Sequence, residues 1–137
     1  FLRPEQRTKE RYAAPGENVD HERFLAEVLV PLQKREVFTY QPFDCSIMDF
    51  GVPCEVRPAA VTIIEGSYAM RKEFQPYYDY KIFMTVGPEK QLMRIQHRDP
   101  SKVQDFKERW IPYEEKYFAA YAVEKDCDIV IDTTDLF

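Results

Sequence analysis

Three short apolar runs rich in β-branched residues divide the chain, at residues 60–65, 80–86 and 128–132. Runs of this length, flanked by turn residues, are typical of strands that a parallel sheet buries on both faces. The segments between them are long enough for crossover helices, and this alternation predicts a parallel α/β sheet. The first run ends in Glu65-Gly66, and open α/β sheets bind ligands at the carboxyl ends of their strands. Glu65 is therefore a candidate ligand-binding residue, and the alternative is a solvated residue at a strand end.

Apolar residues at helical spacing predict a helix ahead of the first of these runs. The repeat extends from Phe24 to Leu32, and Asn18 or Asp20 can cap its first turn. Pro31 lies inside the repeat and removes a backbone donor, so a kink or an early stop is expected there.

A second helical region follows the strand predicted at residues 80–86. Gly87-Pro88 opens it, because proline fits the first position of a helix. Arg94 and Arg98 lie one turn apart on a face away from its apolar positions.

An aromatic stripe marks the helix that comes next. Its members repeat at three or four residues and are predicted to pack on the sheet rather than to hold a cofactor: Val103, Phe106, Trp110, Tyr113, Tyr117 and Tyr121. Pro112 is expected to bend this helix.

Residues 37–57 are predicted to form a β-hairpin. Its first strand covers residues 37–44, where a proline indicates an edge position, a turn is expected at 49–51, and a short strand returns at 54–57. Residues 1–16 are polar, contain two prolines and show no sustained periodicity, so we expect a loop there.

Composition narrows the function classes. A chain of 137 residues with 45% hydrophobic and 15% aromatic content is most simply one globular domain, residues 1–137. The net charge of −5 argues against nucleic acid as a partner, since phosphate binding favours a basic face. No apolar run approaches the ~20 residues that cross a bilayer, and no secretory signal is expected. Three cysteines without metal-ligand spacing, and only two histidines, make a zinc site improbable and indicate free thiols in the cytoplasm.

Seven segments, taken in order, resemble the uridine kinase / phosphoribulokinase group of P-loop kinases. They cover essentially the whole chain: ENVDHERF (17–24), YQPFDC (40–45), TIIEGSYAM (62–70), YDYKIFM (78–84), RIQHRD (94–99), WIPYEEKYF (110–118) and CDIVID (127–132). The family's phosphate loop, G-x-x-x-x-G-K-[ST], is absent, because none of the four glycines is followed by Lys. The resemblance therefore implies the C-terminal part of such a kinase. Its fold would be an incomplete P-loop kinase fold, a parallel sheet with flanking helices and a small β-hairpin, without the first two strands.

By the same resemblance, the parent protein would be an enzyme that transfers the γ-phosphate of ATP to a hydroxyl of a nucleoside or similar acceptor. Glu65 would help to hold Mg²⁺, which prefers carboxylate and water oxygens. Arg94 and Arg98 would belong to a lid over residues 88–110 that binds ATP and stabilises charge on the transferred group. The alternative for both arginines is an ordinary solvated helix face.

The acceptor side would be built from Asp20 and from Tyr40, Phe43 and Asp44 of the hairpin. An aromatic ring can stack on a base, and a carboxylate can accept hydrogen bonds from ribose hydroxyls. Asp20 also fits a simple helix cap, and the two aromatic residues could merely cover the core. The hairpin context YQPFDC differs from the better-known nucleoside-binding version, so the acceptor stays open.

The missing first strands imply that two apolar strand edges face a gap, which invites aggregation unless a chain fills it. The family's general base, an Asp, is also outside this chain, so the fragment alone is expected to be inactive. The alternative function is a non-catalytic α/β module that binds a partner chain through its open sheet edge. Association of the chain with copies of itself is a further partner expectation.

Overall fold

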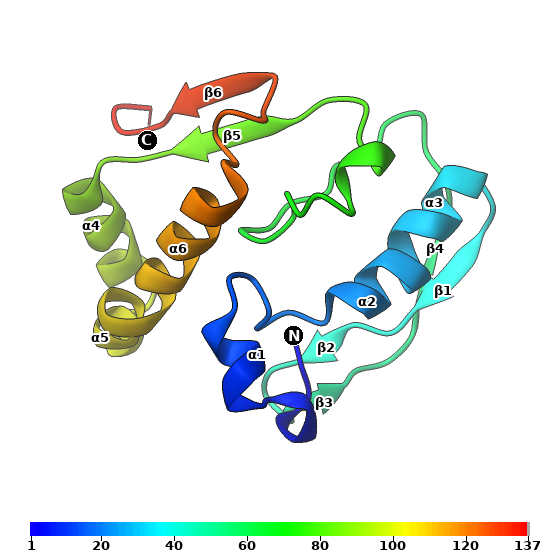
Figure 1. Cartoon of the computed structure of the whole chain (residues 1–137), viewed down its shortest axis with the longest axis horizontal. Coiled ribbons are helices and arrows are strands. Elements are labelled where there is room, and N and C mark those ends of the chain that lie inside the picture. The colour runs from blue at the N-terminus through cyan, green and yellow to red at the C-terminus, as the bar shows by residue number, and fades with distance from the viewer. Residues whose placement is uncertain (137) are drawn as a thin grey trace. The chain divides into compact units, whose positions relative to one another are not determined.

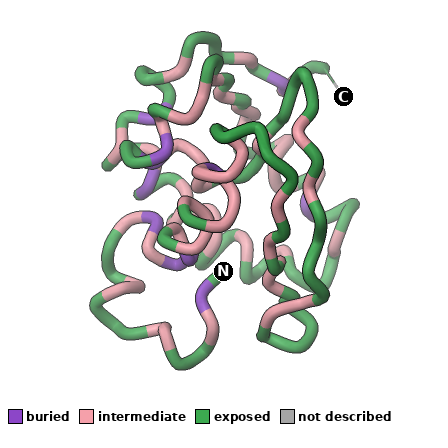
Figure 2. The backbone as a smooth tube through the Cα atoms, turned by 90° about the vertical axis from the view of Figure 1, so that its right-hand side faces the viewer, coloured by how far each residue is buried: buried purple, intermediate pink, exposed green. Residues whose placement is uncertain are grey.

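The computed structural model describes residues 1–136, and the chain divides into two compact units, Phe1–Tyr77 and Tyr78–Phe137. Both units mix short helices with two-stranded sheets (Figure 1). The structure is thus of mixed helix and strand and includes one parallel strand pair, which fits the predicted α/β class in its broad form. That residues 1–137 form a single domain, as expected from the length, stays a prediction. Buried positions form short, separate segments along the chain (Figure 2).

The expected loop at residues 1–16 contains two short helices instead, η1 (Pro4–Gln6) and α1 (Lys9–Ala13). The Thr8 hydroxyl caps α1 by accepting a hydrogen bond of 3.1 Å from the Arg11 backbone N–H. Both helices are shorter than two turns, too short for a hydrophobic repeat to reveal them in the sequence.

The helix predicted around residues 20–32 is present in three continuous parts: α2 (His21–Phe24), the π-helical η2 (Leu25–Leu29) and α3 (Val30–Lys34). Pro31 does not end this helix, which continues to Lys34. The Val30 N–H bonds to the Leu25 carbonyl five residues back, so the turn widens where proline removes a donor. Its buried face packs through Leu29 and Phe24, whose ring meets that of Phe74 edge-on at 5.2 Å.

The hairpin over residues 37–57 is confirmed, in two antiparallel pieces. Strand β1 (Phe38–Tyr40) pairs with β4 (Cys54–Val56), and β2 (Phe43–Asp44) pairs with β3 (Asp49–Phe50). The predicted turn is misplaced: residues 45–48 turn, while Asp49 and Phe50 are in a strand. Pro42 interrupts the first strand, as a residue without a backbone donor should.

The buried strand predicted at residues 60–65 is wrong as an element of this structure. The segment belongs to none of the sheets among residues 1–136, and the side chains of Val61 and Ile63 are 77% and 86% exposed. An apolar strand needs a hydrogen-bonded neighbour on at least one edge, and no described segment pairs with this one. The chain then turns at residues 67–74 and forms the single helical turn η3 (Gln75–Tyr77).

The second unit contains the predicted parallel pair. Strand β5 (Ile82–Thr85) lies beside β6 (Ile129–Asp132), with Ile82 opposite Ile129 and Thr85 opposite Asp132. The crossover between them consists of helices, as the alternating pattern predicted: α4 (Pro88–Arg98), η4 (Pro100–Lys102), α5 (Val103–Asp105), η5 (Phe106–Trp110) and α6 (Ile111–Tyr121).

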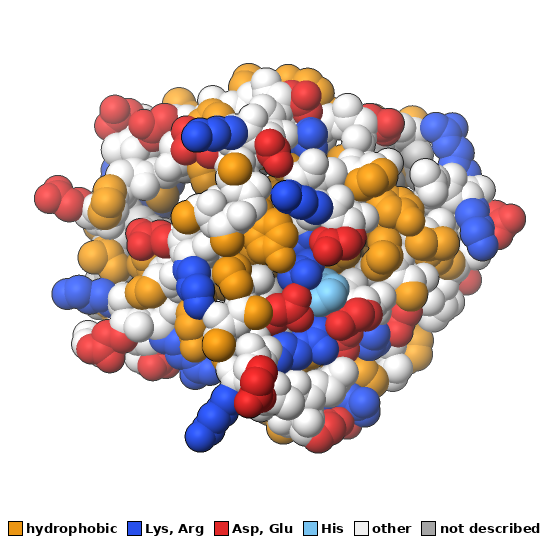
Figure 3. All heavy atoms as spheres, viewed as in Figure 1, with side chains coloured by type: hydrophobic (Ala, Val, Ile, Leu, Met, Phe, Trp, Pro, Cys, Tyr) orange, Lys and Arg blue, Asp and Glu red, His pale blue; other side chains and the backbone are white. Residues whose placement is uncertain are grey.

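One face of this sheet is covered and the other is open. Phe118 of α6 meets Phe83 of β5 edge-on at 5.2 Å, while Ile82 and Met84, on the opposite face, are 53% and 61% exposed. On the side of the molecule that Figure 3 shows, hydrophobic side chains lie among charged ones at the surface. Parallel sheets are usually covered on both faces, so this face is suited to further packing.

Among residues 1–136, no helix is both long and apolar enough to span a lipid bilayer. The finer expectation, a kinase-like sheet of which 60–65 is a central strand, stays a proposal.

Candidate functional site

Arg94 projects from the middle of α4 to the carboxyl edge of the β5–β6 sheet. Its Nη1 donates to the Thr133 hydroxyl at 3.0 Å and its Nη2 donates to the Thr133 carbonyl at 2.6 Å. Thr133 follows the last residue of β6, and its side chain is almost fully buried. The guanidinium is thus fixed where open α/β sheets bind their ligands.

Thr133 is itself tied to the neighbouring strand. Its backbone N–H and its hydroxyl both donate to the Thr85 carbonyl, at 2.8 and 2.9 Å. A hydrogen-bonded chain therefore runs from Arg94 through Thr133 to the end of β5, within one unit.

Arg98 is held much more loosely than Arg94. It is the last residue of α4 and is exposed, and its guanidinium lies over the Phe106 ring, 5.4 Å from the centroid. A cation at a helix C-terminus also interacts favourably with the helix dipole. This arrangement fits an ordinary surface arginine. It fits equally well an arginine whose side chain moves to bind an anion.

A second threonine ties the start of α4 to the end of β6. The Gly87 backbone N–H donates to the Thr134 hydroxyl at 2.8 Å, and this hydroxyl donates to Asp132 at 2.6 Å. That last hydrogen bond lowers the pKa of Asp132. Neither threonine was predicted as a site residue. The signal that could have found them is the run of Asp and Thr directly after an apolar strand, where parallel strands bring polar side chains together.

In the first unit, Asp20 caps α2 as the alternative interpretation held. Its Oδ1 accepts from the Arg23 backbone N–H and its Oδ2 from the Gln6 amide, both at 3.2 Å, and the residue is buried. Both bonds are at the long end of the usual range. Its predicted contact with an acceptor stays a prediction.

The hairpin residues predicted for the acceptor side differ in exposure. Tyr40 and Phe43 are half-buried, and the Phe43 ring meets the Phe1 ring edge-on at 6.2 Å. Asp44 is exposed and accepts from the Ser46 hydroxyl at 2.6 Å and the Ser46 backbone N–H at 2.8 Å. These hydrogen bonds lower the pKa of Asp44, so its carboxylate stays ionised and stabilises the turn.

Arg23, which the sequence did not single out, links the cap to this hairpin. Its backbone N–H bonds to Asp20, its Nη2 donates to the Gln41 carbonyl at 2.9 Å, and its guanidinium lies 3.8 Å from the Phe50 ring centroid. A two-pronged ion pair with Glu27, at 2.6 and 2.7 Å, raises the pKa of Arg23 and lowers that of Glu27. The spacing of four residues between Arg23 and Glu27 was the available signal.

Glu65 is exposed in an irregular segment, so it does not stand at the end of a strand as predicted. The seven predicted site residues divide between the two units. Arg94 and Arg98 belong to the second, and the first holds the other five: Asp20, Tyr40, Phe43, Asp44 and Glu65.

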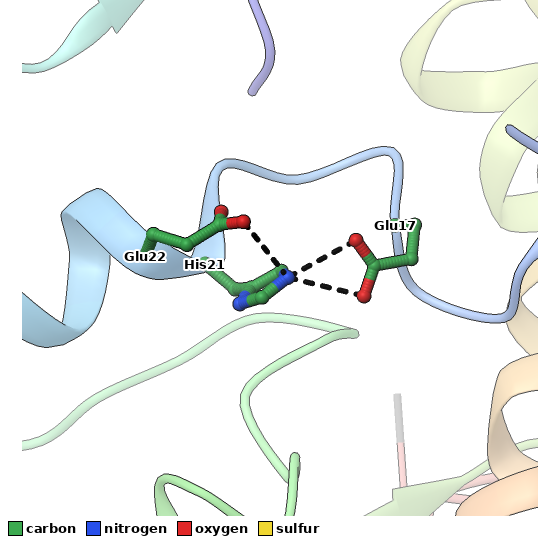
Figure 4. Close-up of side chains that lie close together, drawn as sticks. All are labelled: Glu17, His21 and Glu22. Atoms are coloured by element: carbon green, nitrogen blue, oxygen red, sulfur yellow. Dashed lines mark hydrogen bonds and ion pairs between the residues drawn. The ribbon is translucent and has the colours of Figure 1, made fainter. Parts of the chain in front are cut away.

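Part of the first unit brings a histidine and two carboxylates together (Figure 4). The possible ligand atoms of Glu17, His21 and Glu22 lie within 4.8 Å of one another. Arg71, a buried residue, donates to Glu17 at 2.8 Å, and Arg11 donates to Glu22 at 2.6 Å. Two guanidinium groups beside the carboxylates would repel a cation, so the chemistry fits an ion-pair network that joins α1, α2 and the turn at 67–74 rather than a metal site.

The protonation of Glu17 follows from this network. Burial raises its pKa, but the hydrogen bonds with His21 and Arg71 outweigh burial and leave the pKa of Glu17 below its ordinary value.

No protein-family model matches this chain, and no curated protein is significantly similar to it.

Proposed function

We propose that this chain supplies the acceptor side and the lid of an ATP-dependent kinase that resembles uridine kinase. In this reaction the γ-phosphate of ATP passes to a hydroxyl of a nucleoside or similar acceptor. The observation that carries the proposal is the position of Arg94 beside Thr133, at the carboxyl edge of a parallel strand pair. The seven ordered segments that resemble the family support it independently.

Phosphoryl transfer depends mainly on positioning and on neutralising charge, and each arginine suits one of these needs. Arg94 is already fixed, so it would orient the triphosphate with its planar fork of donors. Arg98 is exposed at the end of α4 and would approach the transferred group as the lid closes.

The acceptor would lie between the start of α2 and the hairpin of the first unit. Asp20 would accept hydrogen bonds from ribose hydroxyls, which would compete with the long bond from Gln6. Tyr40 and Phe43 would supply apolar surface for a base, and Asp44 would border it as an ionised group. All three keep some exposed surface in this unit.

Mg²⁺ would neutralise phosphate charge in this reaction. Glu65 offers one exposed carboxylate for this ion. One carboxylate is compatible with Mg²⁺, which usually binds one or two of them together with water and substrate phosphates. The phosphate loop that the reaction also needs is not among the 137 residues.

The test is a transfer assay with the protein encoded by the complete reading frame. ATP labelled at the γ-phosphate is supplied with Mg²⁺ and, one at a time, with uridine, cytidine, purine nucleosides and small sugar alcohols. We expect label on at least one of these acceptors, in a reaction that stops when Mg²⁺ is chelated. Transfer to none of them would overturn the proposal.

A second candidate function is a non-catalytic module that binds an extended apolar strand of a partner chain. The observation that favours it is the exposure of Val61 and Ile63 in a segment that pairs with no strand among residues 1–136. Light scattering of the 137-residue chain tests whether a second copy is that partner. Self-association that Ile63→Lys abolishes would favour this function. If the 137-residue chain is monomeric and the protein encoded by the complete reading frame is an active kinase, a second copy is excluded as the partner.

A further inference from the structure

We infer that Thr133 is a positioning residue for the proposed reaction: it fixes the guanidinium of Arg94 at the carboxyl edge of the β5–β6 sheet, ready for the phosphates of ATP. Because Arg94 meets ATP only if the chain belongs to a kinase, this step toward ATP rests on the proposed function. The fixation of Arg94 by Thr133 does not, and it can be measured separately.

Thr133 is rigid enough to position another side chain. Its side chain and backbone are only 4% exposed, and its N–H bond of 2.8 Å to the Thr85 carbonyl continues the parallel ladder beyond Asp132. Its hydroxyl is anchored to the same carbonyl at 2.9 Å. Two bonds to one strand end leave this residue little freedom.

The direction of each hydrogen bond is determined by chemistry. The Thr133 hydroxyl has one proton, which it donates to the Thr85 carbonyl, so toward Arg94 it acts as an acceptor. The Thr133 carbonyl provides a second acceptor for the other terminal nitrogen of Arg94, at 2.6 Å. Two acceptors on one residue define both the place and the plane of the guanidinium, and bonds in such a chain reinforce one another.

The two arginines of α4 differ in the contacts that hold their guanidinium groups. Arg94 is set in place by the sheet before any ligand binds, whereas Arg98 has an aromatic contact at 5.4 Å with Phe106. Loss of the Thr133 hydroxyl should therefore weaken the contribution of Arg94 to binding the phosphates of ATP and leave the contribution of Arg98 unchanged.

The experiment uses the protein encoded by the complete reading frame and three threonine variants. Thr133→Val keeps the shape and removes the hydroxyl, Thr133→Ser keeps the hydroxyl, and Thr39→Val is the matched control. Thr39 is exposed in β1 of the first unit, so its variant loses a threonine hydroxyl from a strand outside the unit that contains Arg94. We expect Thr133→Val to lower kcat/KM for ATP on the order of tenfold, the scale of one hydrogen bond to a charged group. Thr133→Ser and Thr39→Val should stay within about twofold of wild type.

Double variants provide a readout that a purely structural role would not produce. Thr133→Val should add little to the loss of kcat/KM caused by Arg94→Ala, because the bond between the two side chains is already gone and only the bond from the Thr133 hydroxyl to the Thr85 carbonyl is left to lose. Combined with Arg98→Ala, its effect should multiply, since the two sites share no bond. If Thr133→Val does not fold, Arg94→Lys tests the same bonds, because an ammonium cannot hold both acceptors in one plane.

Side-chain NMR distinguishes failure of this inference from failure of the proposed function. Exchange of the Arg94 guanidinium protons with water should be slow in wild type and faster in Thr133→Val, whether or not the protein is a kinase. An active kinase in which Thr133→Val leaves both kcat/KM and this exchange unchanged overturns the inference alone. Absence of any ATP-dependent transfer by wild type, with exchange that still depends on Thr133, overturns the kinase function and keeps the fixation of Arg94.

Discussion

Arg98 ends α4 with its guanidinium over the Phe106 ring, while two hydrogen bonds fix Arg94 to Thr133. Spacing along the helix made the two arginines equivalent in the sequence, because both positions lie on one face. The difference comes from Thr133, thirty-nine residues further on. Which arginine is fixed was therefore beyond what a helical pattern can show.

At Arg98, replacement by Ala in the protein encoded by the complete reading frame should lower kcat and kcat/KM together. A lid arginine acts mainly where charge redistributes in the transition state, and we expect a loss on the order of a hundredfold, as for one preorganised donor. Steady-state kinetics measure it, and Arg98→Lys should recover only part of the activity.

Arg109 is the control for that experiment. It also lies over an aromatic ring, that of Trp110, at 4.6 Å from the centroid, so Arg109→Ala removes a comparable surface contact. Its kinetic effect should be close to neutral. Equal and small effects at both positions would reduce Arg98 to an ordinary surface charge.

Glu17 should make the stability of the 137-residue chain sensitive to acid. Its pKa is lower in the folded chain than when unfolded, so its contribution is present above the unfolded pKa of about 4.3 and is lost as the pH falls through the lower folded value. At pH 7, Glu17→Gln should lower the free energy of unfolding by about 2 kcal/mol, because Arg71 loses a charged partner.

Urea unfolding at pH 7 and at pH 3 measures this contribution. The difference between wild type and Glu17→Gln should shrink at the lower pH. Glu22→Gln is the matched control, because Glu22 is exposed and an exposed ion pair contributes about 1 kcal/mol or less. A difference that does not change with pH would contradict the assigned role of the Glu17 carboxylate.

At the scale of elements, the sequence predicted most helices and strands with regular patterns. The helix after Asp20, the hairpin, the helix opened by Gly87-Pro88 and both strands of the parallel pair are all present. These elements carry their own signals in caps, prolines and apolar runs.

The failures have physical reasons. The helix continues past Pro31 to Lys34 after a π-helical turn, in which a bond to the fifth residue back replaces the usual one. Pro112 also follows such a turn, and the bend expected there stays a prediction. The aromatic stripe is confirmed in part, because its member Tyr117 is fully buried. The extra residue in a π-helical turn shifts the face of the helix, and the ring that contacts Phe83 of the sheet is that of Phe118, outside the stripe. The apolar run at 60–65 carries a strand signal, but a strand also needs a partner, which a local pattern cannot supply.

The end of α6 offers a test of its local geometry. The backbone at Ala122 is left-handed, with φ of 49°, and the Val123 N–H closes the helix on the Phe118 carbonyl. Glycine adopts this conformation without steric cost. Ala122→Gly should raise the free energy of unfolding by about 0.5–1 kcal/mol, measured by denaturant titration.

The matched control is Ala120→Gly, two residues earlier. Ala120 is exposed and lies inside α6, where glycine should cost about 1 kcal/mol. Destabilisation of the same size by both substitutions would mean that the helix does not end in a left-handed residue.

At the scale of the molecule, the chain exposes apolar segments that the kinase proposal would cover. Val61 and Ile63 lie in the first unit, and Ile82 and Met84 lie on the open sheet face of the second. In the proposed kinase, residues 60–65 would gain a neighbouring strand from outside the 137 residues.

Hydrogen exchange followed by mass spectrometry tests this consequence. Amides at residues 61–65 should exchange quickly in the 137-residue chain, because no described strand pairs with them. In the protein encoded by the complete reading frame, the same amides should be protected. Amides in β1 and β4 are the internal control and should exchange alike in both proteins, and equal exchange at 61–65 would contradict a central strand there.

The most direct measurement is mass-spectrometric detection of a phosphorylated acceptor after incubation with ATP and Mg²⁺. Two samples are compared: the protein encoded by the complete reading frame and the 137-residue chain, each of verified mass. We expect a nucleoside monophosphate or a comparable phosphate ester from the first sample and none from the second, because the phosphate loop is outside these residues. Turnover by the 137-residue chain, or none by either sample, would contradict the account.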